Sequence, residues 1–159
     1  MGIKMPVIDW TTVSRIMFVC HGNICRSVMA ECVMVWLLEE SGLDVLVASS
    51  ATSTEEIGNP IYPPALSELR RHGVPVIPHR AVQLRRSDLS KYDIFLGADS
   101  VNIRNMLRIL GPEANGKCFR LLDFTDNPRD IADPWYTGGF DETWQDVLEG
   151  CQTILHLLA

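Results

Sequence analysis

The chain has 159 residues, a formal net charge of −6 and a pI near 5.1, and 47% of its residues are hydrophobic, which suits one domain with a substantial core. The acidic balance argues against general nucleic-acid binding, because a phosphate backbone attracts a basic protein face. The sequence has no apolar stretch of about 18 residues and no signal-peptide pattern, so we expect a cytoplasmic protein without a membrane partner, of unknown oligomeric state.

Short apolar runs alternate with helical patterns along the chain, and no repeat or linker divides it. Residues 1–13 are predicted to be an N-terminal extension, and residues 14–159 a single domain. Strands are predicted near residues 16–20, 44–49, 93–98 and 118–122, and helices over 28–38, 63–72 and 140–158. A long loop rich in proline and glycine is predicted over 55–68. This alternation indicates a compact α/β sandwich with right-handed crossovers.

The segment Cys20-His21-Gly22-Asn23-Ile24-Cys25-Arg26-Ser27 connects the first predicted strand to the first predicted helix. In that position the free N–H groups of the loop and the first helical turn converge with the positive end of the helix dipole, which suits a dianionic phosphoryl group. The same field favours the thiolate of Cys20 over the thiol. Arg26 adds a planar fork that can hold two phosphoryl oxygens. The pattern therefore predicts a phosphate-binding loop with a cysteine nucleophile.

Three other residues of this segment fit the same purpose. Gly22 and Asn23 are residue types that readily adopt left-handed conformations, which such a loop needs. The Ser27 hydroxyl can donate a hydrogen bond to the Cys20 sulfur and make it a better leaving group. The alternative is that Cys20 is a small core residue and Arg26 a surface charge, since a bare C-x5-R pattern occurs by chance.

The whole segment resembles the C-x-G-N-x-C-R-S loop of the low-molecular-weight protein tyrosine phosphatases, and it meets every fixed position of that loop. The resemblance extends over about residues 14–159 and includes residues 30–31, 49–53, 57–60, 71–73, 98–102 and 133–136, and His79. It implies a single-domain, three-layer α/β fold in which a four-stranded parallel sheet carries helices on both faces. It also implies hydrolysis of a phosphotyrosine-containing protein or a small aryl phosphate, without metal or cofactor.

The family's general acid lies in an Asp-Pro-aromatic loop before the last helix, and Asp133 matches that position here. The resemblance implies that Cys20 attacks phosphorus while Asp133 protonates the leaving oxygen, and that water, deprotonated by Asp133, then hydrolyses the phosphocysteine. Arg26 and the loop amides would stabilise the charge in place of a metal. The sequence has no H-E-x-x-H motif or cysteine and histidine cluster at ligand spacing, so no metal site is expected. Without the resemblance, Asp133 and the following proline would indicate an ordinary turn.

The resemblance also implies residues that hold the loop in shape. Asn23, Ser27, Ser49 and His79 match a hydrogen-bond network that fixes the phosphate loop in the family. Asp99 matches an aspartate that supports the loop arginine, and it also suits the N-cap of a helix that begins at the next residue. Taken alone, His79 would be an ordinary loop histidine.

Three positions depart from the family pattern. Val28 replaces a usual proline and should soften the start of the helix, while Val82 replaces a common arginine with no predicted consequence. Glu55 falls where the family often has an aromatic residue on one wall of the substrate crevice, whereas Trp135 and Tyr136 suit the opposite wall. We therefore expect a phenyl ring to stack on one side only, and acidic phosphopeptides to bind more weakly than neutral or basic ones.

The five cysteines are odd in number and do not form the pattern of a secreted disulfide framework, so we expect them to be reduced at rest. In the family, the cysteine that matches Cys25 forms a reversible disulfide with the nucleophile, which protects the nucleophile from over-oxidation. A reactive thiol with a resolving neighbour suits this chemistry. We therefore expect a redox role for Cys25 in preference to a purely structural one.

Four alternative functions use the same fold or loop. An arsenate reductase would need two further cysteines soon after the middle of the chain, and none lies between Cys32 and Cys118. A cysteine phosphocarrier would hold phosphocysteine without needing Asp133, and a phosphate-binding module would not need intact catalytic residues. A phosphoarginine phosphatase would be favoured by a small polar threonine at the position of Ile24, which instead leaves room for an aryl group.

Overall fold

Four parallel strands form the central layer of the molecule in the computed structural model, which describes residues 8–159. The strands are β1 (Arg15–Cys20), β2 (Leu46–Ala51), β3 (Ile94–Gly97) and β4 (Cys118–Arg120). They lie in the order β2-β1-β3-β4, and each neighbouring pair is parallel. The predicted fold class, a four-stranded parallel sheet between helices, is confirmed.

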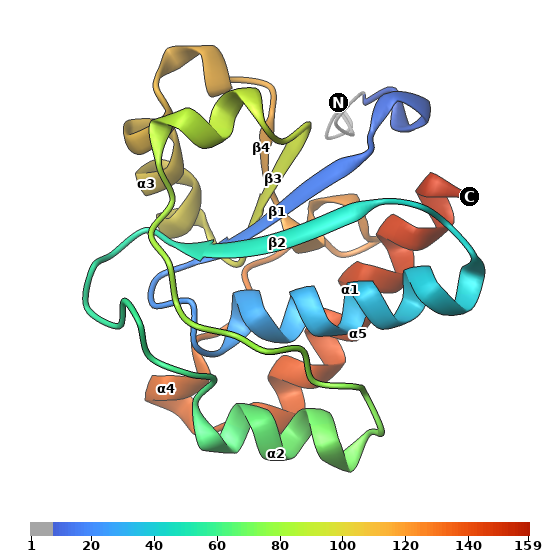
Figure 1. Cartoon of the computed structure of the whole chain (residues 1–159), viewed down its shortest axis with the longest axis vertical. Helices are drawn as coiled ribbons and strands as arrows, with labels where there is room; N and C mark the ends of the chain where they lie inside the picture. The colour runs from blue at the N-terminus through green and yellow to red at the C-terminus, as the bar shows by residue number, and fades with distance from the viewer. Residues whose placement is uncertain (1–7) are drawn as a thin grey trace.

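Helices cover both faces of this sheet (Figure 1). They are α1 (Arg26–Ser41), α2 (Pro63–Arg71), α3 (Ser100–Leu110), α4 (Pro134–Thr137) and α5 (Phe140–Leu158). Short 3-10 turns occur at η1 (Trp10–Thr12), η2 (Arg86–Ser90), η3 (Pro112–Ala114) and η4 (Leu121–Phe124). Figure 1 shows α1, α2 and α5 on one side of the sheet and α3 on the other, so the molecule has three layers.

The central strand β1 is apolar on both faces because it has a helical layer on each side. Ile16 and Phe18 belong to the core between the sheet and the layer of α1 and α5. The alternate residues Met17 and Val19 belong to the core between the sheet and α3. This is the usual burial of a parallel strand, in which successive side chains point to opposite faces. The double burial fixes the position at which β1 ends, and therefore the position of Cys20.

Several element boundaries differ from the predicted ones. The strand predicted over 44–49 begins at residue 46, because α1 continues to residue 41 and is closed by the left-handed Gly42 at φ 68°. The strand predicted over 118–122 ends at Arg120. There the backbone N–H of Arg120 donates to Asp123 Oδ2 at 2.8 Å, which starts the turn η4. Both differences arise from capping contacts that apolar periodicity does not reveal.

The structure also describes the predicted loop over 55–68 and part of the predicted N-terminal extension. The loop predicted over 55–68 ends at residue 62, because Pro63 begins α2. In the N-terminal extension, Val13 is buried in the core and Trp10 packs edge-to-face on Phe124 with ring centroids 5.2 Å apart. This part lies at the edge of the sheet away from the end of β1 (Figure 1). Residues 1–7 lie outside the described part, and the domain boundary at residue 14 stays a prediction.

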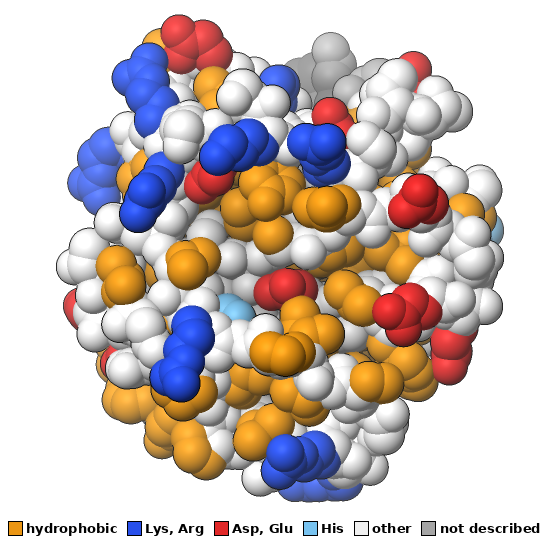
Figure 2. Space-filling model, viewed as in Figure 1, with side chains coloured by type: hydrophobic (Ala, Val, Ile, Leu, Met, Phe, Trp, Pro, Cys, Tyr) orange, Lys and Arg blue, Asp and Glu red, His pale blue; other side chains and the backbone are white. Residues whose placement is uncertain are grey.

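The surface charge is uneven despite the acidic net charge. Figure 2 shows basic side chains gathered at one end of the viewed face, over α3 and η2. The exposed basic residues of this region are Arg85, Arg86, Lys91, Arg104 and Arg108.

Within residues 8–159, no helix is long and apolar enough to cross a bilayer.

Candidate active site

The candidate site lies at the carboxyl end of β1, the edge at which ligands bind in open parallel sheets. Cys20 is the last residue of β1, and Arg26 is the first residue of α1. The loop between them is named the phosphate loop below and comprises residues 20–27. Since β2 and β3 flank β1 on either side, the loop emerges where the connections of the chain diverge to opposite sides of the sheet.

The phosphate loop surrounds the Cys20 sulfur with hydrogen-bond donors. The backbone N–H groups of Asn23 and Ser27 point to Cys20 Sγ at 3.3 and 3.4 Å, and Ser27 Oγ lies 3.0 Å from it. Cys20 is only 3% exposed, so these donors act in a poorly hydrated environment. Three convergent donors stabilise a negative charge on the sulfur, which is what a thiolate nucleophile requires.

Asn23 holds the loop together from its centre. Among residues 8–159 it is the one non-glycine residue with a positive φ, 59°, and it is fully buried. Its Nδ2 donates to Ser27 Oγ at 2.8 Å and to Ser49 Oγ at 2.9 Å, while its Oδ1 accepts from the Val82 N–H at 3.1 Å. His79 Nε2 donates to the Asn23 carbonyl at 2.6 Å. The four residues of the predicted network therefore lie together, and Val82 joins them through its backbone.

The directions of these bonds follow from hydrogen-bond counting. Both amide hydrogens of Asn23 go to hydroxyl oxygens, so the two hydroxyl hydrogens must point elsewhere. The Ser27 hydrogen is free to point at Cys20 Sγ, and Ser49 Oγ donates to Glu31 Oε1. Burial raises the pKa of Glu31, an effect that the Ser49 bond opposes. Glu31 was not predicted as a site residue, because a carboxylate on a helix usually indicates a solvated face.

His79 is a neutral donor in this network. Burial lowers the pKa of His79, and its hydrogen bond to the Asn23 carbonyl acts in the opposite direction. Since a carbonyl oxygen only accepts, the proton is assigned to Nε2. The residue therefore supports the loop as an uncharged imidazole near neutral pH.

The Arg26 guanidinium is held by three oxygens from distant parts of the chain. Its Nη1 donates to Asp99 Oδ2 at 2.7 Å and to the Ile131 carbonyl at 2.8 Å, and its Nη2 lies 3.4 Å from Asp133 Oδ2. The other oxygen of Asp99 accepts from the Asn102 N–H at 2.8 Å, which caps α3. Asp99 thus makes both contacts predicted for it. Ile131 was not predicted, since it acts through its backbone.

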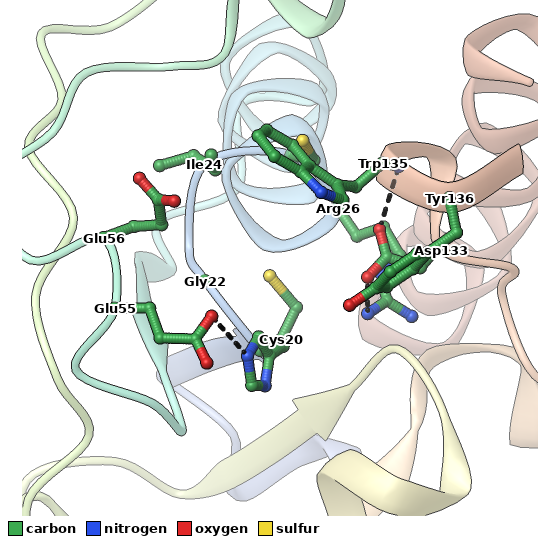
Figure 3. Close-up of a pocket in the computed structure, with 11 residues that line it drawn as sticks. Cys20, Gly22, Ile24, Arg26, Glu55, Glu56, Asp133, Trp135 and Tyr136 are labelled. Atoms are coloured by element: carbon green, nitrogen blue, oxygen red, sulfur yellow. Dashed lines mark hydrogen bonds and ion pairs between the residues drawn. The ribbon is translucent and has the colours of Figure 1, made fainter. Parts of the chain in front are cut away.

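Asp133 faces the same pocket as the cysteine. It is the N-cap of α4, where its Oδ1 accepts from the Trp135 N–H at 3.1 Å. Its side chain is 25% exposed, so protons can exchange with solvent. The pocket encloses about 520 Å³, including space open to solvent at its mouth, and Cys20 and Arg26 also line it. Figure 3 shows the Cys20 sulfur between two walls, with Asp133 on one of them.

The two walls of the pocket differ in chemistry (Figure 3). One carries Trp135 and the 82% exposed Tyr136, and Trp135 packs on Tyr62 with ring centroids 4.7 Å apart. The other carries Glu55 and Glu56. The residues predicted for the walls are therefore placed as expected. Tyr62 and Glu56 belong to the loop 55–68 that was predicted to lie over the site, but neither side chain was singled out, because a loop sequence does not show which side chains point inward.

The glutamate wall is tied to the phosphate loop. Glu55 Oε2 lies 3.1 Å from His21 Nε2, which forms a hydrogen bond across the mouth of the pocket. Gly22 was predicted to share the left-handed conformation of Asn23, and this prediction is wrong, because Gly22 does not have a positive φ. The glycine instead allows a close approach, since a Cβ at Gly22 would lie 3.3 Å from Glu56 Cγ.

Cys25, the second cysteine of the phosphate loop, and Val28, which replaces the family's usual proline, are both buried. Burial raises the pKa of Cys25 to about 12, with the charges of Cys20 and Asp133 acting in the same direction and Arg26 opposing them. Cys25 is therefore a protonated thiol at neutral pH. Val28 is fully buried in the core, and α1 begins two residues before it. Within the described residues all five cysteines are free, and no three potential ligands are grouped as a metal site.

Comparison with known proteins identifies the family. A family model described as low molecular weight phosphotyrosine protein phosphatase matches residues 15–159. The chain is 34% identical to the low molecular weight protein-tyrosine-phosphatase YfkJ of Bacillus subtilis, over 88% of this chain and 92% of that protein. It is also 34% identical to low molecular weight phosphotyrosine protein phosphatase 1 of Drosophila melanogaster, over 90% of this chain and 96% of that protein.

Solved structures agree with the sequence comparison. The crystal structure of YfkJ from Bacillus subtilis has a TM-score of 0.87 at 33% identity, covering 91% of this chain and 94% of that chain. The structure of Vibrio vulnificus Wzb in complex with benzylphosphonate has a TM-score of 0.81 at 29% identity, covering 91% of this chain and 98% of that chain. The chain therefore belongs to the low molecular weight phosphotyrosine protein phosphatase family.

Proposed function

We propose that the protein is a metal-independent phosphatase that hydrolyses phosphotyrosine and related aryl phosphomonoesters through a phosphocysteine. The observation that carries this proposal is the convergence of Cys20, Arg26 and Asp133 on one pocket whose sulfur faces three hydrogen-bond donors. A nucleophile, a cationic fork and a carboxyl group within one cavity are the parts that phosphoryl transfer to a side chain needs. Membership of the phosphatase family supports the same activity.

In the first step the Cys20 thiolate attacks phosphorus and a P–S bond forms. The P–O bond to the aryl group breaks, its electron pair goes to the leaving oxygen, and Asp133 supplies a proton to that oxygen. The loop N–H groups and Arg26 stabilise the equatorial phosphoryl oxygens. Asp99 and the Ile131 carbonyl keep Arg26 in place, so little reorganisation is needed as charge develops.

In the second step water attacks the phosphocysteine while Asp133, now a carboxylate, accepts a proton from that water. The P–O bond to water forms, the P–S bond breaks, and the electron pair returns to Cys20. The Ser27 hydroxyl, whose oxygen already accepts from Asn23 Nδ2, donates a hydrogen bond to the departing sulfur 3.0 Å away and stabilises it as a thiolate. The products are inorganic phosphate and the regenerated thiolate.

The walls of the pocket support an aromatic substrate. Trp135 and Tyr136 provide flat surfaces beside the floor formed by the phosphate loop, and Tyr62 supports Trp135 by packing against its ring. Benzylphosphonate, the compound bound to the related Wzb, is an aromatic ring that carries a phosphonate, and so resembles the head of phosphotyrosine. We therefore propose a phosphotyrosine-containing protein or a small aryl phosphate as substrate.

The test is the hydrolysis of para-nitrophenyl phosphate from pH 4 to 8 with a chelator present. We expect Cys20→Ser to abolish turnover and Asp133→Asn to lower it by about a hundredfold to a thousandfold. Asp141→Asn, which changes an exposed carboxylate at the start of α5, serves as the control and should match the wild type. A wild type without turnover would refute the proposal, and phosphate held stably on Cys20 would favour a phosphocarrier. Parallel assays with phosphoarginine would identify that alternative.

We also propose that Cys25 protects the nucleophile. Hydrogen peroxide would convert the Cys20 thiolate to a sulfenic acid, and the Cys25 thiol would condense with it to form a disulfide and water. Because burial raises the pKa of Cys25 to about 12, this residue stays a protonated thiol at neutral pH and does not act as the nucleophile in place of Cys20. After peroxide treatment, the wild type should recover activity with a dithiol reductant, whereas Cys25→Ser should lose activity irreversibly. Equal recovery of both proteins would refute this role.

We place the protein in the cytoplasm, again as a proposal. All five cysteines are free within the described residues, and the proposed mechanism needs a reduced Cys20. A compartment that keeps thiols reduced meets this need. Fractionation of cells that produce the protein would test it, and recovery from an oxidising compartment would contradict it.

A further inference from the structure

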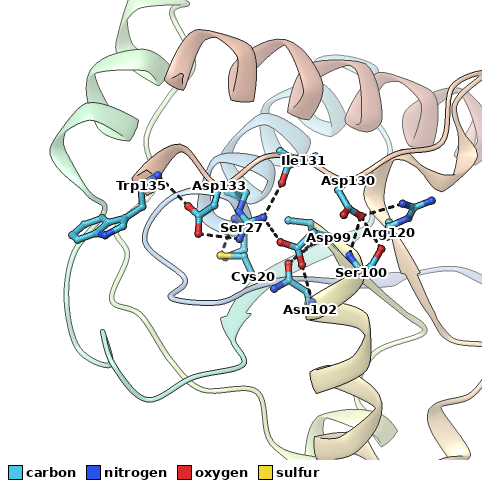
Figure 4. Close-up of polar contacts among 12 residues, drawn as sticks. Cys20, Ser27, Asp99, Ser100, Asn102, Arg120, Asp130, Ile131, Asp133 and Trp135 are labelled. Atoms are coloured by element: carbon cyan, nitrogen blue, oxygen red, sulfur yellow. Dashed lines mark hydrogen bonds and ion pairs between the residues drawn. The ribbon is translucent and has the colours of Figure 1, made fainter. Parts of the chain in front are cut away.

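A carboxylate that the proposed mechanism does not use lies three residues before Asp133. Asp130 Oδ1 accepts hydrogen bonds from the Ser100 N–H at 2.9 Å, the Ser100 hydroxyl at 2.9 Å and Arg120 Nη1 at 3.1 Å (Figure 4). One oxygen thus connects the segment before α4 to the start of α3 and to the end of β4. The fixed position of this carboxylate needs an explanation, because its side chain is 51% exposed.

The residue after this carboxylate holds the catalytic arginine. The Ile131 N–H donates to the Ala98 carbonyl at 2.9 Å, and its own carbonyl accepts from Arg26 Nη1 at 2.8 Å. Ile131 is only 1% exposed, so it cannot shift without opening the core. The backbone is therefore clamped at residue 131 by Ala98, the residue that follows β3, and at Asp130 by its side chain. Two residues later, the chain places Asp133 beside the same guanidinium.

The partner of Asp130 also belongs to the grip on Arg26. Ser100 is the first residue of α3, and its N–H is one of the free donors at the positive end of that helix. The preceding residue, Asp99, holds Arg26 Nη1 at 2.7 Å. By binding Ser100, Asp130 therefore fixes the distance between two segments that both hold Arg26.

The cationic partner is itself held in position. Arg120 Nε donates to Asp123 Oδ1 at 2.8 Å, which leaves Nη1 to reach Asp130. Because its Nε side is already held, the Arg120 guanidinium is a preorganised donor. Binding Asp130 therefore costs less side-chain entropy than it would for a freely rotating arginine. The clamp thus consists of Asp130, Ser100 and Arg120.

We propose that Asp130 is a positioning residue for catalysis, which places the Ile131 carbonyl and the Asp133 carboxyl against Arg26 by binding Ser100 and Arg120. This inference rests on the proposed phosphatase function. It predicts a defect in the delivery of the proton to the leaving group, because Asp133 lies at the exposed end of the clamped segment. A small displacement of a catalytic group is enough to lower the rate substantially.

The test compares substrates whose leaving groups depend differently on a proton. Phenolate, like the tyrosine side chain, is a poor leaving group and needs Asp133, whereas para-nitrophenolate leaves readily with less help. We expect Asp130→Ala to lower kcat/KM for phenyl phosphate by about tenfold to a hundredfold, and for para-nitrophenyl phosphate by a clearly smaller factor. Asp130→Asn keeps an acceptor for Ser100 and loses the charge that faces Arg120, so it should show an intermediate defect.

The matched control is Asp146→Ala. Asp146 pairs with Arg129, the neighbour of Asp130, at 2.8 Å, so its removal breaks an ion pair on the same segment outside the clamp. It should leave the ratio of the two substrates unchanged. If Asp130 had a merely structural role, Asp130→Ala would lower the melting temperature and would reduce kcat/KM for both substrates by the same factor. That result would overturn the proposal. So would an Asp130→Asn variant indistinguishable from the wild type. A wild type without activity would instead refute the proposed function itself.

Discussion

The two halves of the site are built in different ways. The phosphate loop is one continuous segment in which the Cys20 sulfur, the Asn23 amide and the Ser27 hydroxyl bond to one another within eight residues. More distant residues, Ser49, His79 and Val82, add further hydrogen bonds to Asn23. The acid segment, residues 130–136, is more exposed and depends on contacts with residues that lie far away in the sequence. The groups that bind phosphate therefore lie within one segment of the chain, whereas the group that moves protons is brought to them by the tertiary fold. Arg26 joins them.

Substitution of Arg26, which contacts both halves of the site, should have the largest effect on activity. In Arg26→Lys, a single ammonium cannot hold Asp99, the Ile131 carbonyl and the phosphoryl oxygens at once, because it lacks the planar fork. We expect kcat/KM for para-nitrophenyl phosphate to fall by about a thousandfold. Arg129→Lys, at an ion pair outside the pocket, should retain full activity. A loss of less than about tenfold in Arg26→Lys would contradict the proposed role of the fork.

The hydrogen-bond network of the phosphate loop can be tested at its centre. Asn23→Ala removes the bonds to Ser27, Ser49 and the Val82 N–H and places alanine at φ 59°. We expect the free energy of unfolding, measured with urea, to fall by about 3 kcal/mol, and turnover to fall with it.

Asn23→Gly separates backbone strain from the lost bonds. It loses the same side chain without the strain, so it should be about 1 kcal/mol more stable than Asn23→Ala. Asn105→Ala on α3 is the control and should stay within about 0.5 kcal/mol of the wild type. Equal stabilities of the two Asn23 variants would show that the left-handed conformation is not strained.

A smaller effect is expected in the pH dependence of stability, through His79, which supports the phosphate loop. Burial lowers the pKa of His79 in the folded state, so the unfolded chain binds more protons between the two pKa values. This contribution to stability is complete above the unfolded pKa of about 6.5 and is lost as the pH falls below it. We expect His79→Gln, which can still donate to the Asn23 carbonyl, to weaken the rise in unfolding free energy between pH 5 and 7. His156→Gln, on an exposed position of α5, should leave that rise unchanged.

The smallest effect is expected from Glu55, at the exposed mouth of the pocket. Glu55 is 68% exposed and lines the pocket, so it should repel acidic residues that flank the phosphotyrosine. In Glu55→Lys, kcat/KM for an acidic phosphopeptide relative to a basic one should rise by about twofold to fivefold. Glu113→Lys makes the same charge change outside the pocket and should leave the ratio unaltered. An unchanged ratio in Glu55→Lys would refute this account of specificity.

Much of the fold could be predicted from the sequence because the strands are buried on both faces. A short continuous apolar run such as residues 16–19 suits a central parallel strand, whose side chains are buried on both faces of the sheet. The ends of the elements were less accessible. The start of β2 depends on how Gly42 closes α1, and the end of β4 on how Asp123 caps a turn, and neither contact follows from hydrophobic periodicity.

The site could be predicted in proportion to how local its contacts are. The phosphate loop is a continuous segment, so its residues are visible in the sequence. Glu31, Tyr62 and Asp130 escaped prediction because each meets the site only after elements pack together. Ile131 could not be found by any side-chain pattern, since it contributes a carbonyl oxygen.

The long-range grip on Arg26 has a consequence for protein synthesis. During synthesis the phosphate loop is complete once residue 27 has been added, yet the carbonyl of Ile131 and the carboxyl of Asp133 follow more than a hundred residues later. Until then the guanidinium lacks two of its three partners and the leaving group lacks its proton donor. Incomplete translation products are therefore expected to be catalytically silent, although they carry the complete C-x5-R motif. The fold thus keeps hydrolysis from starting before residues 131–133 have been added and have packed against Arg26.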